Sequence, residues 1–191
     1  MYLISQSTYE LGRVLNHFYK IKPLTQVSLP VPPSMLDLLN STHLNSLQKL
    51  GVRQSLYPLS IVVGPPGTRK TRTLASIVCA AYLDGEGVLC LGKSNVAVRR
   101  LCQEIAKGVP RDDLGLVMSK EYYKYWHEGL YKGLKRYFVT NCKRNVLCMT
   151  TSLYISYRQK GWLPHGFVGV VDGVEVMRKR SVLVLEESSQ I

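Results

Sequence analysis

Short apolar runs alternate with helical patterns through the middle of the chain. Residues 61–63 form an apolar run before a Gly-rich turn, and apolar positions at helical spacing follow over 74–81. Residues 88–91 are wholly apolar, which is typical of a buried parallel strand, and Ser94 can cap a helix that reaches about residue 107. This order of strand, helix, strand, helix predicts an α/β fold, a parallel sheet with right-handed crossovers and flanking helices.

The segment before this pattern is expected to be a flank. Residues 11–18 carry apolar side chains at helical spacing, and the proline-rich stretch 30–33 stops any helix. A second helical pattern begins at Thr42, a suitable N-cap, and leads into the first strand. We therefore divide the chain into a flank, residues 1–43, and a domain, residues 44–191.

The alternation changes in residues 108–144, which we interpret as a helical insertion. Its part 118–137 is dense in aromatic and basic residues. A strand is expected again at 145–149, and the Asp-Gly pair at 172–173 favours a hairpin. A short apolar run at 182–185 predicts a final buried strand.

Composition describes a globular protein. Hydrophobic residues make up 46% and charged residues 20% of the 191 residues, and no apolar run approaches the roughly 20 residues of a membrane span. We find no secretory signal pattern. The five cysteines are odd in number and lack C-x-x-C spacing, which indicates buried thiols in a reducing compartment. We expect an intracellular location, cytoplasmic or nuclear, with no membrane partner.

The charge balance is strongly basic. The formal net charge is +12, which suits a polyanionic partner such as nucleic acid. The alternative is a basic surface that only confers solubility.

The most specific motif is a phosphate-binding loop at residues 64–71, which follow the pattern G-x-x-x-x-G-K-[ST] with one exception. Backbone N–H groups of such a turn and of the following helix converge on phosphate oxygens, the Lys neutralises charge, and the Thr hydroxyl reaches Mg²⁺. Lys70 is also a candidate catalytic residue and Thr71 a candidate magnesium ligand. The candidate nucleotide-binding residues are Gly64, Pro65, Pro66, Gly67, Thr68, Arg69, Lys70 and Thr71.

The exception is Arg69, which replaces the Gly before the Lys. A Cβ and a long cation now lie where the backbone approaches phosphates closely and where Gly tolerates dihedral angles that other residues avoid. We therefore expect weakened ATP binding.

Two acidic residues, Glu186 and Glu187, follow the final strand. In an open α/β sheet, ligands collect outside the carboxyl ends of strands, where the phosphate-binding loop also lies. Glu186 is thus a candidate magnesium ligand with Thr71, and Glu187 a candidate catalytic residue that orients or deprotonates the attacking water. Charged residues are common at strand ends, so the two glutamates alone are weak evidence for a functional site.

Together these motifs resemble a known family. Residues 58–71, the S-N-V-A-V sequence at 94–98 and the E-E-S-S-Q sequence at 186–190 resemble the first RecA-like domain of superfamily 1 helicases of the Up-frameshift type. The resemblance implies an ATP- and Mg²⁺-dependent translocase on single-stranded RNA or DNA. It also implies that Gln48, in a sequence similar to the Q motif, reads adenine, and that Ser94 and Asn95 touch the nucleic-acid backbone.

Three departures from the family pattern bear on activity. Arg69 replaces Gly, Glu186 replaces Asp, and the sequence stops at Ile191. In such helicases a second RecA-like domain supplies an arginine to the cleft. We therefore expect a truncated ATPase domain, with an exposed sheet edge or a missing core strand. Hydrolysis and unwinding would need a second RecA-like domain, in trans or in a longer product.

The insertion has two interpretations. In one, aromatic residues stack on bases and basic residues meet phosphates. In the other, Tyr122, Trp126, Leu130 and Leu134 pack the insertion on the sheet and the lysines are solvated. The candidate nucleic-acid-binding residues of the first interpretation are Tyr123, Lys124, Lys132, Lys135 and Arg136.

Two functions from different classes follow. The first is a helicase-type ATPase domain that binds ATP weakly, with Mg²⁺. The second is a degenerate, non-enzymatic nucleic-acid-binding remnant. A small-metabolite kinase would explain the phosphate-binding loop but not the S-N-V-A-V and E-E-S-S-Q sequences or the charge.

Overall fold

A computed structural model describes most of the chain. The described residues are 2–5, 31–41, 43–56, 59–62, 64–65, 67–119, 122, 139, 144–160, 166–171 and 174–186.

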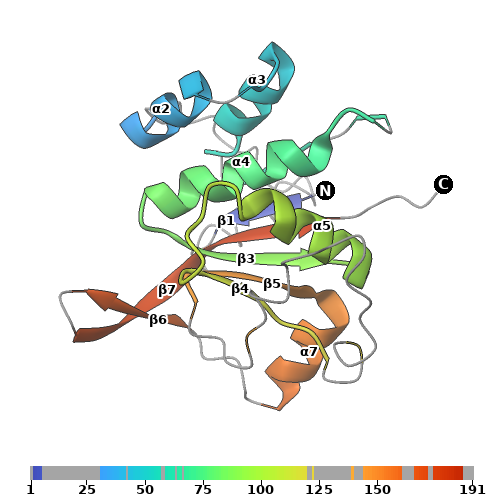
Figure 1. Ribbon diagram of the computed structural model, residues 1–191, viewed down its shortest axis with the longest axis vertical. Coiled ribbons are helices and arrows are strands. Elements are labelled where there is room, and N and C mark those ends of the chain that lie inside the picture. Colours follow the sequence, from blue (N-terminus) through green and yellow to red (C-terminus); the bar gives the residue numbers. More distant parts are fainter. Residues whose placement is uncertain are drawn as a thin grey trace, which may run out of the picture.

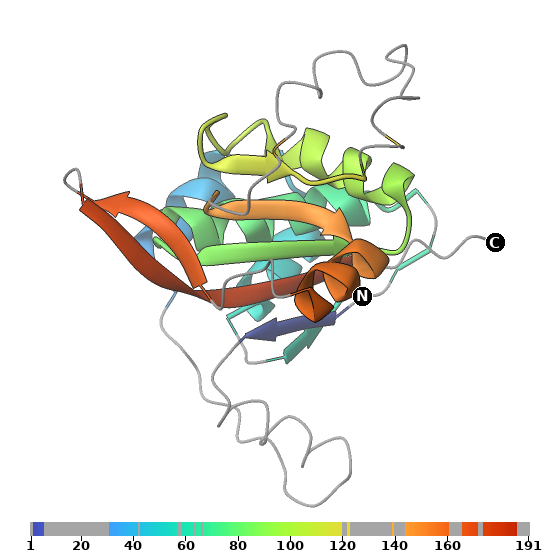
Figure 2. The same cartoon turned by 90° about the horizontal axis from the view of Figure 1, so that it is seen from below.

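The core of the fold is a sheet in which four neighbouring strands, in the order β7-β3-β5-β4, run parallel. Two further strands extend it beyond β7 in the order β1-β2, and β6 pairs with β7 as a hairpin (Figure 2). The strands are β1 (Tyr2–Ser5), β2 (Leu59–Ile61), β3 (Gly87–Gly92), β4 (Leu114–Leu116), β5 (Val146–Thr150), β6 (Gly166–Val171) and β7 (Val174–Glu186).

Helices cover both faces of the parallel strands. Helices α4 and α5 lie on one face, α2 and α3 pack outside α4, and α7 lies on the opposite face (Figures 1 and 2). Helix α4 is therefore enclosed, and every residue from Thr73 to Ala80 is buried. The helices are α2 (Pro33–Ser41), α3 (Ser46–Gln54), α4 (Lys70–Leu83), α5 (Asn95–Ile105) and α7 (Thr151–Gln159).

The alternation of side chains in the central strands builds two separate cores. Val88 and Cys90 of β3 belong to the cluster under α4 and α5, whereas Leu89 and Leu91 belong to the cluster with Leu153 and other residues of α7. Strands that are buried on both faces have to be apolar throughout, which is why their sequence shows no polar alternation. The predicted α/β fold with a parallel sheet and flanking helices is confirmed.

Local capping signals explain where the helices begin. The Ser94 hydroxyl accepts a hydrogen bond of 3.2 Å from the Ala97 N–H, as the sequence predicts. Helix α3, however, is capped by Asn45 and not by Thr42, which lies outside the described residues. Helix α2 was not expected from the proline-rich stretch. It begins at Pro33, because proline suits a first helical position that needs no N–H donor.

The hairpin and the final strand are one continuous element. Strand β7 has 13 residues and pairs antiparallel with β6 before it pairs parallel with β3. Between these parts Gly87 pairs with Arg180 and Val88 with Val182, so Ser181 is an additional residue, as in a β-bulge. The sequence predicts a hairpin and a separate short strand.

Residues 2–5 also depart from the sequence pattern, which assigns residues 1–43 to a flank. Strand β1 lies inside the sheet, between β2 and β7.

The described cysteines fit the expectation of buried thiols. Cys79, Cys90, Cys102 and Cys148 are free and buried, and Cys142 lies outside the described residues. Burial raises the pKa of the Cys79 thiol to about 11, so this thiol stays protonated and unreactive at neutral pH. Among the described residues, no helix has the length and apolar character that crossing a membrane requires.

Candidate nucleotide-binding site

The phosphate-binding loop connects β2 to α4 at the carboxyl edge of the sheet (Figure 1). Gly67 has a φ of 83°, which only glycine adopts at no steric cost. The Thr68 hydroxyl donates a hydrogen bond of 2.8 Å to the Pro65 carbonyl and closes the turn. Pro66 lies outside the described residues.

Arg69 occupies the left-handed region of backbone conformation. Its φ is 57° and its ψ 39°, and it is the only non-glycine residue with a positive φ in the described part of the chain. Such a conformation costs a residue with a Cβ about 1–2 kcal/mol. The backbone at position 69 therefore keeps the conformation that suits glycine, although the residue there is arginine.

The Lys70 ammonium lies against its own loop. Its Nζ donates hydrogen bonds of 2.7 Å to the Gly64 carbonyl and 2.9 Å to the Pro65 carbonyl. These two carbonyl contacts hold the cation at the mouth of the loop, where the positive end of the α4 helix dipole also lies.

A direct contact joins the loop to the acidic end of β7. Thr71 Oγ1 donates a hydrogen bond of 2.8 Å to Glu186 Oε1, although the two residues are 115 positions apart. Glu186 is the last residue of β7 and is 9% exposed. The two residues that the sequence predicts as magnesium ligands are therefore adjacent.

The second oxygen of Glu186, Oε2, is buried and has no hydrogen-bond donor beside it among the described residues. A buried, unpaired carboxylate oxygen costs free energy unless a proton or a cation satisfies it. A carboxylate oxygen beside a threonine hydroxyl is a donor set that Mg²⁺ accepts when substrate phosphates complete the shell, so the residues fit this ion.

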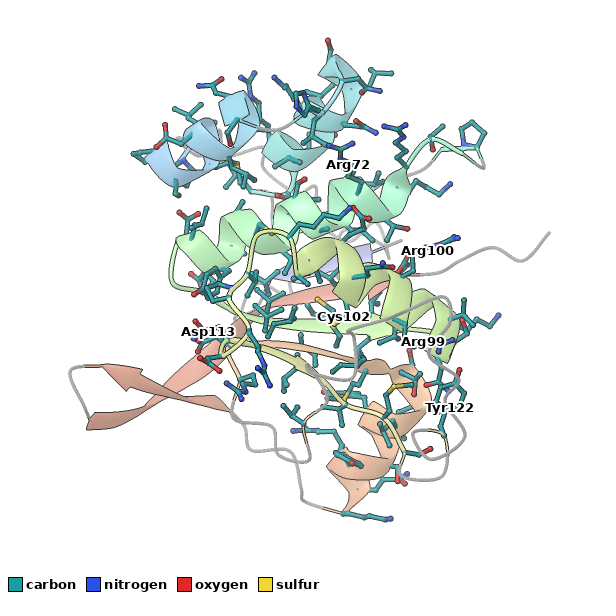
Figure 3. The ribbon with its side chains drawn as sticks, in the orientation of Figure 1. Arg72, Arg99, Arg100, Cys102, Asp113 and Tyr122 are labelled. Atoms are coloured by element: carbon teal, nitrogen blue, oxygen red, sulfur yellow. The ribbon has the colours of Figure 1, made fainter. Side chains whose placement is uncertain are left out.

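Competing effects act on the Glu186 carboxyl. Burial raises its pKa, and the hydrogen bond from Thr71 and the positive charge of Arg100 oppose that rise. Arg100 projects from α5, the helix that begins within the S-N-V-A-V sequence (Figure 3). No sequence motif marks Arg100, because its proximity to Glu186 depends on the packing of α5 against the sheet.

Gln48 is placed beside the loop by helix α3. Its backbone N–H donates to Asn45 Oδ1 at 2.9 Å, and its side-chain Oε1 accepts from the Asn45 N–H at 3.0 Å, which forms a capping box. Its Nε2 also donates a hydrogen bond of 3.2 Å to the Thr68 carbonyl.

A cavity of about 230 Å³ lies at this junction. Its lining offers hydrogen-bonding groups, which can fix the orientation of a bound base or ribose. His43 and Asn45 belong to this lining and were not singled out from the sequence. The cavity is lined by His43, Asn45, Gln48, Gly67, Thr68 and Arg69.

The predicted nucleic-acid contacts are only partly described. Ser94 and Asn95 follow the carboxyl end of β3, at the same edge of the sheet as the phosphate-binding loop, and both are half-buried. Outside the described residues lie Glu187, Tyr123, Lys124, Lys132, Lys135 and Arg136.

Tyr122, in the aromatic and basic part of the insertion, packs against the core. The guanidinium carbon of Arg99 lies 5.5 Å from the centre of the Tyr122 ring, and Arg99 is only 8% exposed (Figure 3). A cation over an aromatic ring at this distance is an attractive contact, stronger where water is excluded. For Tyr122 this favours the packing interpretation, because Arg99 covers one face of the ring that stacking on a base would need.

A second cavity, of about 280 Å³, lies at the opposite edge of the sheet and does not belong to the site. It is lined by residues including Tyr82, Glu86 and Asn145. Tyr82 and Asn145 each donate a hydrogen bond of 2.6 Å to Asp113, which Figure 3 shows at the far end from Arg100. Burial and the hydrogen bond to Asp113 raise the pKa of Tyr82 to about 12. These hydrogen bonds connect α4 to the residues that precede β4 and β5.

The fold and the site together define a class. A parallel sheet with flanking helices, a phosphate-binding loop between strand and helix, and an acidic residue on the end of another strand make a P-loop NTPase fold of the RecA-like type.

Comparison with known proteins leads to one group of helicases. Over 104 residues the chain is 36% identical to the regulator of nonsense transcripts 1 homolog of Neurospora crassa, which covers 53% of this chain and 9% of that protein. It is 38% identical over 104 residues to the ATP-dependent helicase NAM7 of Saccharomyces cerevisiae, 52% of this chain and 10% of that protein. It is also 40% identical over 81 residues to the DNA-binding protein SMUBP-2 of Mus musculus, 41% of this chain and 8% of that protein.

These relatives are Upf1-like superfamily 1 helicases, so the resemblance inferred from the motifs is confirmed. The chain spans about a tenth or less of the length of these three relatives. No family model matches the sequence. No solved structure matches it.

Proposed function

We propose that this chain is the nucleotide-binding part of a helicase-type ATPase domain, which binds MgATP and single-stranded nucleic acid inside the cell. The observation that carries the proposal is the 2.8 Å hydrogen bond between Thr71 and Glu186. It brings a phosphate-binding loop and an acidic strand end, remote in sequence, into one site.

Each residue of the site has a separate task in this proposal. Backbone N–H groups of the loop and of α4 bind phosphate oxygens, and Lys70 exchanges its loop carbonyls for them. Thr71 and Glu186 would hold the magnesium ion, which supplies charge neutralisation between the phosphates. Gln48 orients the base from the neighbouring cavity, and Glu187 positions the attacking water.

Hydrolysis is proposed to require a second RecA-like domain. Phosphoryl transfer depends on positioning and on stabilisation of charge, and an arginine supplied from outside a P-loop is worth about 10³–10⁵ in rate where it has been measured. The relative named as the ATP-dependent helicase NAM7 is much longer than this chain, which supports this view of the whole enzyme. The second candidate function, a non-enzymatic nucleic-acid-binding remnant, is supported by Arg69 in the loop.

The magnesium proposal has a direct test. Replacing Thr71 by Val removes the hydroxyl and keeps the volume, so ATP affinity in the presence of Mg²⁺ should fall about five-fold, a loss of roughly 1 kcal/mol. Affinity in EDTA should be unchanged. Calorimetric titrations of both proteins with ATP, with Mg²⁺ and with EDTA, measure this difference.

Ser94→Ala is the matched control for Thr71→Val. It also removes a hydroxyl near a helix start at the same edge of the sheet, but Ser94 caps α5. This variant should lose stability and keep the Mg²⁺ dependence of binding. An equal response to Mg²⁺ in the wild type and in Thr71→Val would contradict the proposed site.

Nucleic-acid binding should be salt-dependent and independent of sequence. The net charge of +12 supports this, and each phosphate neutralised on a single strand contributes about −0.7 to the slope of log affinity against log salt. Replacing Lys124, Lys132, Lys135 and Arg136 by Ala should flatten the slope by up to about 3, measured by fluorescence anisotropy on labelled oligonucleotides.

The control for this variant is Tyr123→Ala. Loss of a stacking platform should weaken binding with the slope nearly unchanged. If the quadruple variant keeps the wild-type slope, the insertion does not contact phosphates and the positive charge has another use.

A further inference from the structure

The short strand β1 lies between the two strands that carry the proposed nucleotide site (Figure 2). On one side it pairs with β2, which leads into the phosphate-binding loop, and on the other with β7, which ends in Glu186. The paired positions are Tyr2 with Ile61, Leu3 with Ser60 and Val184, Ile4 with Leu59 and Leu183, and Ser5 with Val182.

Strand β2 reaches the rest of the sheet through β1. Among the described residues, β2 is the last strand of the sheet order and β1 is its strand neighbour. The backbone ladder that holds the phosphate-binding loop to the sheet therefore passes through four residues.

The direction of β1 determines where the loop lies. Because β1 is antiparallel to both neighbours, β2 and β7 point the same way, and their carboxyl ends meet at one edge of the sheet. Strands in a sheet are about 4.8 Å apart, so one strand between β2 and β7 sets them about 10 Å apart. The 2.8 Å contact from Thr71 to Glu186 is made at that separation. Direct pairing of β2 with β7 would shift the loop by about 4.8 Å, which is more than this contact tolerates.

The slot between β2 and β7 has the features of a strand-binding site. Both of its edges offer backbone N–H and C=O groups, and its β7 wall carries Val184, which is fully buried, and the half-buried Val182 and Leu183. Edge pairing supplies affinity and alternate apolar side chains supply selectivity in such sites.

We propose that this slot is a binding site for a short, extended, apolar peptide strand, filled by residues 2–5 of this chain, and that its occupation assembles the nucleotide site. The second half of this inference rests on the function proposed above. Residues 2–5 are positioning residues: they touch no nucleotide, and they act through the spacing of β2 and β7.

The test removes backbone N–H groups of β1 and leaves the residues of the nucleotide site unchanged. In a strand with neighbours on both sides, successive N–H groups face opposite neighbours, so Leu3→Pro with Ile4→Pro interrupts both ladders. We expect faster hydrogen exchange at those N–H groups of residues 59–61 and 182–184 that face β1, unchanged exchange in β3 and β5, and a several-fold loss of ATP affinity. The matched control, Leu3→Val with Ile4→Val, keeps every N–H and should behave as the wild type.

Complementation tests the slot itself. A synthetic peptide of residues 1–6, Met-Tyr-Leu-Ile-Ser-Gln, should restore both exchange protection and ATP affinity to the double-proline variant. The same peptide with proline at the third and fourth positions should not. Failure of the unmodified peptide to restore protection would overturn the strand-binding site.

A photocrosslink keeps the inference testable if the proline variant fails to fold. A benzophenone amino acid in place of Ile4 in the otherwise intact protein should crosslink to 59–61 or 182–184. A crosslink within one chain, or between two copies that exchange the strand, supports the slot. Crosslinks confined to other segments overturn it.

The readouts separate this inference from the proposed function. Hydrogen exchange and crosslinking need no nucleotide, so a wild-type protein that shows both and binds no ATP refutes the proposed function alone. Full ATP affinity in a variant that has lost protection at β2 and β7 refutes the assembly role of β1.

Discussion

Replacement of Lys70 by Ala should lower the affinity for MgATP by about 30-fold, the largest loss expected from any single side chain of the site. Hydrogen bonds to charged groups contribute about 1.5–3 kcal/mol, and 2 kcal/mol corresponds to about 30-fold. The structure holds the Lys70 ammonium at the mouth of the loop through the Gly64 and Pro65 carbonyls, ready to exchange them for phosphate oxygens. Calorimetric titration with MgATP measures the loss.

Lys107→Ala is the charge-matched control for Lys70→Ala. Lys107 is exposed, follows the end of α5 and forms an ion pair of 2.6 Å with Glu104, so its loss removes the same charge far from the loop. It should leave the affinity for MgATP within two-fold or so of the wild type, because distant exposed charges are screened. Equal losses in the two variants would mean that net charge, and not the loop, attracts the nucleotide.

Replacement of Arg69 by Gly should have the opposite effect and raise ATP affinity about ten-fold, or about 1.4 kcal/mol. The structure changes the reason for this expectation. Because Arg69 already has a φ of 57° without nucleotide, its backbone strain belongs to folding and not to binding. The gain in affinity should come from removing the Cβ and the long side chain beside the phosphates, and relief of strain should appear as a small rise in thermal stability.

Arg69→Ala separates these two contributions. Alanine keeps the Cβ and its strain but removes the cation, so it should keep the wild-type thermal stability to within a few tenths of a kcal/mol. If the cationic side chain obstructs the phosphates, Arg69→Ala should recover part of the affinity that Arg69→Gly recovers in full. Equal ATP affinities of the wild type and Arg69→Gly would refute the argument that Arg69 weakens binding.

The sequence predicts those parts of the fold that local patterns determine. The order of elements from residue 59 to residue 105 follows from the change between apolar runs and helical spacing, and the Ser94 cap follows from residue type. The sequence also predicts that Thr71 and Glu186 belong to one site, since strand ends of a parallel sheet meet at one edge, and their hydrogen bond is consistent with this.

Other features of the fold depend on competing local signals or on contacts between residues that are remote in sequence. Thr42 and Asn45 are both suitable N-caps, and Asn45 caps α3 because Gln48 three positions later completes the capping box. The position of residues 2–5 depends on pairing with strands more than 50 positions away, for which a four-residue stretch carries no local signal. The contact of Arg99 with Tyr122 likewise arises from tertiary packing.

The additional residue at Ser181 has a consequence for how the chain can change over time. Side chains alternate along a strand with a period of two, so a one-residue shift reverses the face of every position beyond it. The irregularity between Arg180 and Val182 absorbs such a shift inside β7. Substitutions and length changes in the hairpin half can therefore be accommodated there, while Glu186 continues to face Thr71.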